Sequence, residues 1–274
     1  MRKYSVSILL VTLLVGSRVA LAAPPAFAIV TVLHGLPAVT ADVYINGVLT
    51  LDGFEPKSAT DPLELPPGDY HIEIRDVGAA ADSPPVLEGS ATIKAGQNIS
   101  IIAGLSETGD RILNVFPNDQ SAVGAGKIRL VARHAAAAAP LDVRIDGTTV
   151  LSGIGNAEEA TRLMAAGTHS VEFTEAGSDD VLIGPLDVAM GEGTEQILYA
   201  VGSKEEQSLD VMTQTLTDLQ SDPTDVNTGD GGLAATGDFP AYAVALMAIA
   251  GVGFVVSSVW LLRNRRSRHA APNG

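Results

Sequence analysis

The hexapeptide DVYING at residues 42–47 has a counterpart, DVRIDG at residues 142–147, in this chain of 274 residues. In both segments polar and apolar residues alternate ahead of an Asn-Gly or Asp-Gly pair. Alternation puts the apolar side chains on one face of a β-strand. A two-residue type I′ turn needs positive φ at both central positions, which Asn, Asp and Gly adopt most readily. Each hexapeptide therefore predicts a strand that enters a tight hairpin.

The similarity extends along both halves of the chain. Three further pairs of segments match at almost the same offset: 51–53 with 151–153, 68–74 with 167–173, and 99–104 with 197–202. Drift of one or two residues in loop length accounts for the small differences in offset. The pattern predicts a tandem duplication, with one copy at residues 29–119 and a second at 126–216.

Each copy predicts an all-β fold. Short alternating segments separated by Gly, Pro, Asn and Asp at intervals of about ten residues are typical of a β-sandwich, of the immunoglobulin-like or transthyretin-like kind. Residues 156–164 are compatible with one or two helical turns. Their counterpart at 55–65 contains Pro56 and Pro62, which a regular helix excludes. We therefore expect both segments to be a loop or a sheet edge.

One recognisable pattern runs through the first copy. It consists of a strand with Val-x-His, a Pro-containing loop, the Asp-Val hexapeptide and a later Pro-Gly-x-Tyr. Its residues here are Val32, His34, Pro37, Asp42, Val43, Tyr44, Ile45, Asn46, Gly47, Pro67, Gly68 and Tyr70. This pattern resembles the bacterial domain-of-unknown-function family 4397. The second copy keeps Val131, His134, Asp142, Val143, Ile145, Asp146, Gly147 and Gly167, with Arg144 in place of Tyr44 and the alanines 135–139 in place of the loop. The resemblance implies secreted or surface-attached sandwich modules with no established activity.

The N-terminus has the layout of a secretory signal peptide. Arg2 and Lys3 precede an apolar run at 5–16, which is too short to span a bilayer. Small-residue cleavage patterns follow, so we expect residues 1–28 to be a signal peptide cut after Ala22 or Ala28. The body of the protein is then exported.

The C-terminus has the composition of a membrane span. Residues 239–262 carry no charge, and at about 1.5 Å per residue a helix of this length crosses a hydrocarbon core of about 30 Å. The basic tail at 263–274 holds four arginines, which places it in the cytoplasm by the positive-inside rule. We therefore expect a transmembrane helix with the body outside the cell.

The pentapeptide before this span reads LAATG: Leu233, Ala234, Ala235, Thr236 and Gly237. Together with the span and the basic tail it resembles the sorting signal of sortase substrates in Gram-positive bacteria, in the Leu-Ala-x-Thr-Gly form of high-GC species. The resemblance implies a class E sortase as a partner, cleavage after Thr236 and linkage to peptidoglycan. Ala234 departs from the commoner Pro, so a membrane anchor without processing stays open. Residues 217–232 are acidic and Gly-rich, and they predict a flexible stalk.

Charge and composition exclude several function classes. The chain has no cysteine, which excludes disulfides and thiolate chemistry. Residues 29–236 carry 10 basic and 31 acidic side chains, a net charge of −21, which argues against nucleic acid as a ligand. We find no catalytic constellation, cofactor motif or metal-binding motif, and we expect His34 and His134 to tie down the loop after the first strand of each copy. His71 and His169 occupy adjacent positions of the repeat and so opposite strand faces, which argues against a repeated metal site.

These features together predict a non-enzymatic protein displayed on the cell wall of a Gram-positive, high-GC bacterium. Its role would be structural, adhesive or ligand-binding, with a surface ligand that the sequence does not identify. The alternative is an extracellular ligand-binding or sensory module that no sortase processes and that keeps its C-terminal membrane helix.

Overall fold

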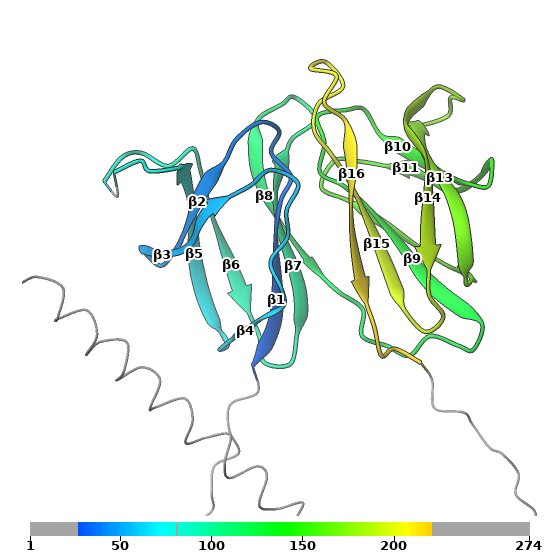
Figure 1. The fold of residues 1–274 in the computed structure, drawn as a ribbon, viewed down its shortest axis with the longest axis horizontal. Coiled ribbons are helices and arrows are strands. Elements are labelled where there is room, and N and C mark those ends of the chain that lie inside the picture. Colours follow the sequence, from blue (N-terminus) through cyan, green and yellow to red (C-terminus); the bar gives the residue numbers. More distant parts are fainter. Residues whose placement is uncertain (1–26, 81, 221–274) are drawn as a thin grey trace, which may run out of the picture. The chain divides into compact units, whose positions relative to one another are not determined.

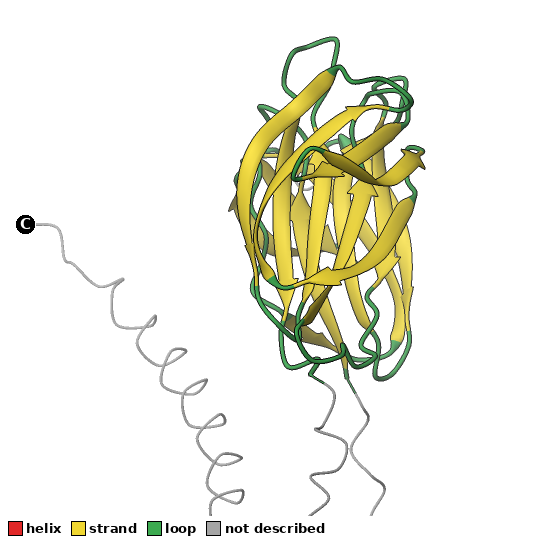
Figure 2. Ribbon diagram, turned by 90° about the vertical axis from the view of Figure 1, so that its right-hand side faces the viewer, coloured by secondary structure: helices red, strands yellow, loops and turns green. Residues whose placement is uncertain are grey.

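The computed structural model describes residues 27–80 and 82–220, which contain only strands and loops (Figure 2). The prediction of an all-β fold is confirmed. Nearly all of the predicted signal peptide, most of the stalk, the sorting motif and the predicted span lie outside the described residues. Within the described ranges there is no helix long and apolar enough to cross a membrane.

Sixteen strands follow one another along the described chain (Figure 1). The first half holds β1 (Ala28–His34), β2 (Ala41–Ile45), β3 (Val48–Phe54), β4 (Leu63–Leu65), β5 (Gly68–Asp76), β6 (Leu87–Ile93), β7 (Asn98–Leu105) and β8 (Arg111–Pro117). The second half holds β9 (Lys127–His134), β10 (Leu141–Ile145), β11 (Thr148–Ile154), β12 (Glu159–Ala165), β13 (Gly167–Glu175), β14 (Val181–Met190), β15 (Glu195–Val201) and β16 (Asp210–Leu216).

Each half is a sandwich of two four-stranded sheets with the same strand order. In the first half an inner sheet β4-β1-β7-β8 faces an outer sheet β3-β2-β5-β6. In the second half β12-β9-β15-β16 is the inner sheet and β11-β10-β13-β14 the outer one. The central pairs of the inner sheets, β1 with β7 and β9 with β15, are parallel, whereas every other strand pair is antiparallel.

The two predicted hairpins form as expected. Asn46 and Gly47 have φ values of 50° and 76°, and Asp146 and Gly147 have values of 51° and 77°. Both central residues of each turn thus have the positive φ that a type I′ turn requires. The strands on either side pair directly, with Ile45 opposite Val48 in the first half.

A third hydrophobic cluster joins the two halves. Each half has its own core between its two sheets, but the inner sheets also pack face to face, and the described residues of both halves belong to one compact unit. Buried residues of both halves make up this shared layer: Leu33, Ile102, Phe116, Val131, Ala135, Ile197, Tyr199, Val201 and Met212. The molecule therefore has four sheets in succession, with the two inner ones covered on both faces.

Burial of the inner sheets on both faces explains the apolar composition of their central strands. Parallel strands buried on both faces have continuous apolar runs, since neither face meets water. Residues 99–105 of β7 and all of β15 are buried. In β7, Ile101 points into the first core, while its neighbour Ile102 packs between the halves.

The two segments predicted to be a loop or an edge are edge strands. β4 and β12 lie at the ends of their sheets and pair antiparallel with β1 and β9. β4 has only three residues, in keeping with the prolines on either side of it, whereas β12 has seven.

Candidate functional site

The interface between the halves holds a buried polar network centred on Arg133. Its Nε lies 2.8 Å from Glu159 Oε2, and its Nη1 donates to the hydroxyl of Tyr199 at 2.7 Å. That hydroxyl in turn donates to Oε1 of Gln214, and the Nε2 of Gln214 donates to Thr31 of the first half. Burial raises the pKa of Tyr199, so its hydroxyl keeps its proton and remains a donor. These side chains satisfy one another, and the network fastens the halves together.

Loops from both halves meet at one end of the body. Residues 202–209 form the turn that joins β15 to β16. This turn lies at the opposite end of the strand pair from Leu216, after which the last described residues follow. Loops 35–40, 106–110 and 135–140 lie at the same end (Figure 1), which we call the distal end. An open cleft of about 800 Å³ separates these loops, lined by Glu107, Thr108, Gly109, Ala137, Ala138 and 203–206. A neighbouring hollow of about 200 Å³ adds Leu36, Pro37, Val39, Leu105 and Arg111. We call the two together the distal cleft.

Small residues let the two backbones approach each other beneath this cleft. A Cβ on Gly104 would lie 2.7 Å from the carbonyl oxygen of Ala135, and a Cβ on Gly35 would lie 2.9 Å from a methyl carbon of Val201. The Leu105 amide donates to the Ala135 carbonyl across the halves. The alanines at 135–138 are all buried. Ala135 packs in the layer between the halves and Ala137 against the first core, while Ala136 and Ala138 belong to the core of the second half.

The distal cleft is acidic. Glu107, Glu205 and Glu206 are exposed, and none of them forms an ion pair with another described residue. Lys204 is paired with Glu175, which leaves Arg111 as the cation in the cleft that has no acidic partner within the described ranges. A concave site with three uncompensated carboxylates favours a cationic ligand over an anionic one.

The repeated histidines lie just below the distal loops and are buried. His134 accepts a hydrogen bond from the Ala136 amide and contacts the Ala139 carbonyl at 3.2 Å, so the expected loop-tying role is confirmed there. The ring of His34 stacks on Phe54, and neither of its nitrogens has a hydrogen-bond partner in the part of the chain that the structure describes. Burial lowers the pKa of both histidines, so both are held neutral.

His34 also lines a small cavity inside the first sandwich. The cavity measures about 20 Å³ and is otherwise walled by apolar residues, including Ile74 and Ile93. At the structurally equivalent positions the second half holds Phe173, which is larger than Ile74, and Met190, which is longer and more flexible than Ile93. The cavity has room for about one water molecule, so it is no site for an organic ligand.

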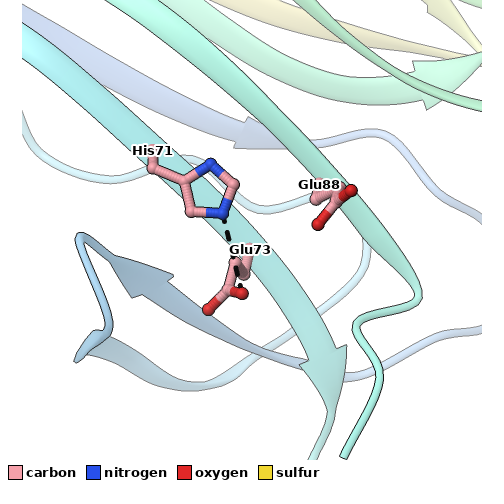
Figure 3. A group of neighbouring side chains, drawn as sticks. All are labelled: His71, Glu73 and Glu88. Atoms are coloured by element: carbon pink, nitrogen blue, oxygen red, sulfur yellow. Dashed lines mark ion pairs between the residues drawn. The ribbon is translucent and has the colours of Figure 1, made fainter.

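A histidine and two glutamates gather on the outer face of the β3-β2-β5-β6 sheet (Figure 3). His71 and Glu73 alternate along β5, and Glu88 of β6 lies directly opposite Glu73. The Nε2 of His71 is 3.6 Å from Oε1 of Glu73, and one ligand atom from each of the three residues lies within 4.8 Å of the others. From the sequence, His71 was weighed only together with His169 as a metal site repeated in both halves, and its proximity to Glu73 and Glu88 was not predicted.

The comparison with known proteins concerns mainly the first half. Residues 28–144 match the family described as Domain of unknown function (DUF4397). The resemblance predicted from the hexapeptide and its flanking residues is confirmed for this stretch. The match covers all eight strands of the first half and continues through β9 to Arg144 of β10. Among curated proteins, none is significantly similar to this chain.

The DUF4397 match ends inside the second half, yet the structure gives equivalent roles to residues of both halves. Asp42 accepts hydrogen bonds from the amides of Gly53 and Gly78, and Asp142 accepts them from Gly153 and Gly177. The repeated aspartate thus ties a strand, β3 or β11, to the loop that follows β5 or β13, which is a structural role. The predicted sorting residues Leu233, Ala234, Ala235, Thr236 and Gly237 lie outside the described residues.

Proposed function

We propose that this chain is a non-enzymatic surface protein that presents the distal cleft to a cationic ligand away from the cell. The observation that carries the proposal is the position of the cleft at the end of the body opposite Gln220. Beyond Gln220 the chain continues into the predicted stalk, sorting motif and span. A body anchored through its C-terminus would therefore hold the cleft outward.

The rigidity of the body supports this role. A flexible pair of domains would alter the cleft continually, because its walls come from both halves. Here the shared hydrophobic layer and the Arg133 network fix one half against the other, so the cleft is pre-formed and a ligand loses less entropy on binding. We propose that the second half is a further copy of the same domain and that the duplication creates the cleft.

We propose further that a class E sortase links Thr236 to peptidoglycan. The support is the order of LAATG, an uncharged span and an arginine-rich tail. Cells expressing the wild-type chain should release it with a muralytic enzyme and retain it in detergent. Thr236→Ala should reverse this, because it removes the Thr side chain that the sorting pattern has immediately before the cleaved bond. Release of the wild type by detergent alone, with the tail intact, contradicts wall attachment.

That outcome would favour the second candidate, a membrane-held ligand-binding or sensory module. The observation in its favour is Ala234, which stands where the commonest sorting motif has proline. Mass spectrometry of the C-terminus separates the two candidates directly. A peptidoglycan fragment on Thr236 supports the first, and a C-terminus at Gly274 supports the second.

The ligand class is tested with a lysine-rich peptide as the probe. Replacing Glu107, Glu205 and Glu206 by Gln together should weaken binding of the peptide at least tenfold at low salt. A control variant removes the same charge elsewhere on the exposed surface through Glu64→Gln, Asp187→Asn and Asp218→Asn. Equal loss in both variants would show non-specific attraction to the net charge rather than recognition by the cleft.

A further inference from the structure

We propose that His71, Glu73 and Glu88 bind a divalent transition-metal ion, with Zn²⁺ as the best fit, on the outer sheet of the first half. This site is separate from the distal cleft, which lies between the halves. A result that contradicts the metal site therefore leaves the proposal for the distal cleft unaffected, and the reverse also holds.

Strand geometry brings the three side chains together. Residues two apart on a strand point to the same face, so His71 and Glu73 share the solvent side of β5. The register pairs Glu73 with Glu88 and His71 with Ser90, which puts Glu88 beside both of the other ligands (Figure 3). The ligands come from two hydrogen-bonded strands, so the spacing of their backbone positions is fixed by the sheet.

The charges at this position are not balanced by the protein. Carboxylates directly opposite each other on neighbouring strands repel and destabilise the pair. Glu73 has an ion-pair partner in Arg75, at 3.1 Å, but Glu88 has no hydrogen bond or ion pair with the described residues. A divalent cation between the two carboxylates would remove this repulsion.

Arg75 supplies a second, independent observation. Its side chain is only 7% exposed, and its Nη2 lies 3.1 Å from Oε1 of Glu73. Its Nε and Nη1 are buried without a hydrogen-bond partner among the described residues. Unpaired buried donors are costly, and these belong to the guanidinium that contacts the cluster. An acceptor brought by the ion, such as a bound water, would satisfy one of them, while Nη2 orients Glu73 as outer-shell partners orient metal ligands.

The second half shows that the fold does not need this cluster. At the equivalent positions Ser170 replaces His71, and Glu172 replaces Glu73. Glu172 lies 3.8 Å from Arg144, the residue that replaces Tyr44, so its charge is compensated across the strands. The equivalent sheet therefore forms with a neutralised glutamate and with serine in place of the histidine ligand.

The ligand types favour zinc over calcium or magnesium. Imidazole suits zinc and other late transition metals, whereas calcium and magnesium take oxygen ligands alone. A tetrahedral site with bonds of about 2.0 Å has ligand atoms about 3.3 Å apart. The separations here all lie within 4.8 Å, so a small inward movement of the exposed His71 and Glu88 side chains suffices for binding. Three protein ligands leave one position open for water.

The test is a titration of Zn²⁺ into the purified full chain in detergent, without a polyhistidine tag. Calorimetry should show one ion per chain, and His71→Ala and Glu88→Gln should each weaken binding at least tenfold. His169→Ala, in the second half, should leave affinity unchanged. Millimolar Ca²⁺ or Mg²⁺ should not displace the ion.

A stability measurement guards against misfolded variants. Relative to the Tm of the same protein in EDTA, Zn²⁺ should raise the Tm of the wild type and of His169→Ala, but not that of His71→Ala or Glu88→Gln. A wild-type chain that binds no Zn²⁺, or binding that survives both His71→Ala and Glu88→Gln, overturns the proposal. Displacement of the ion by Ca²⁺ overturns the assignment to a transition metal.

Discussion

The guanidinium of Arg133 in β9 lies over the ring of Phe116 in β8, with 4.7 Å between its Cζ and the ring centroid. The two residues belong to different halves, so a buried cation of one sandwich rests on an aromatic ring of the other. Arg133 also has a carboxylate and a phenol as hydrogen-bond partners. Desolvation strengthens such a contact but makes an unpaired charge costly, which makes this residue the most sensitive point of the interface.

Replacing Arg133 by Met should lower the free energy of unfolding by about 2–4 kcal/mol, because it removes a buried, paired charge. The loss is measured by urea denaturation. Arg162→Met is the matched control, since Arg162 lies exposed on β12, and it should cost less than about 0.5 kcal/mol. If the two variants unfold at the same urea concentration, the network does not hold the halves together.

Gly104→Val should disturb the contact between the halves. The new Cβ would lie 2.7 Å from the Ala135 carbonyl oxygen, and overpacking of this kind costs about 1–3 kcal/mol. Thermal unfolding should therefore begin at a lower temperature than in the wild type. Gly124→Val is the control, because nothing lies within 4 Å of a Cβ at that position. A Gly104→Val chain as stable as this control would show that the backbones are free to separate.

His34 should make stability depend on pH below neutrality. Burial lowers its pKa, so the folded chain binds fewer protons than the unfolded chain, whose histidines titrate near pH 6.5. Its contribution is complete above pH 6.5 and is lost as the pH falls through 6.5 toward the lowered pKa. His34→Leu should flatten this slope in urea titrations between pH 7.5 and 5, without loss of stability at pH 7.5, because two unpartnered nitrogens are removed.

The control for this experiment is the wild-type chain, measured in EDTA over the same pH range. An unaltered slope in His34→Leu would assign the acid sensitivity to His134, whose pKa burial also lowers.

Asp42→Asn should destabilise the first half at neutral pH. The amides of Gly53 and Gly78 lower the pKa of Asp42, so its stabilising effect is complete above the ordinary aspartate pKa and is lost as the pH falls through the lowered value. At pH 7 the variant should lose about 1–2 kcal/mol, the worth of a charge-assisted hydrogen bond. The gap to the wild type should narrow near pH 2. Asp61→Asn, at an exposed position, should show neither effect.

Much of each sandwich was predictable because its signals are local. The turn at Asn46-Gly47 depends on the φ preferences of two adjacent residues, and Val43 shows its buried face through alternation with its neighbours. The prolines on either side of β4 likewise act locally, because they exclude a regular helix and restrict the segment to a short edge strand. The DUF4397 resemblance rested on such short patterns, and the family match confirms it over residues 28–144.

The candidate sites needed information that short patterns do not carry. Glu88 meets Glu73 only because the loop between β5 and β6 sets one register among several, and a slip of one residue would turn Glu88 away. The sequence does show that His71 and Glu73 lie two residues apart on one strand, but it does not identify Glu88 as a third ligand. The absence of polar alternation in β7 was likewise a visible signal of double burial.

Backbone sterics and hydrophobic alternation act between near neighbours, so the strands, the hairpin turns and the all-β class follow from the chain's own order. The packing of one half on the other does not, because it depends on which sheet faces meet. Gly104 and Ala135 are ordinary small residues in sequence, and they let the two backbones approach closely only because the inner sheets face each other. The four-sheet body and the cleft at its distal end arise from that contact.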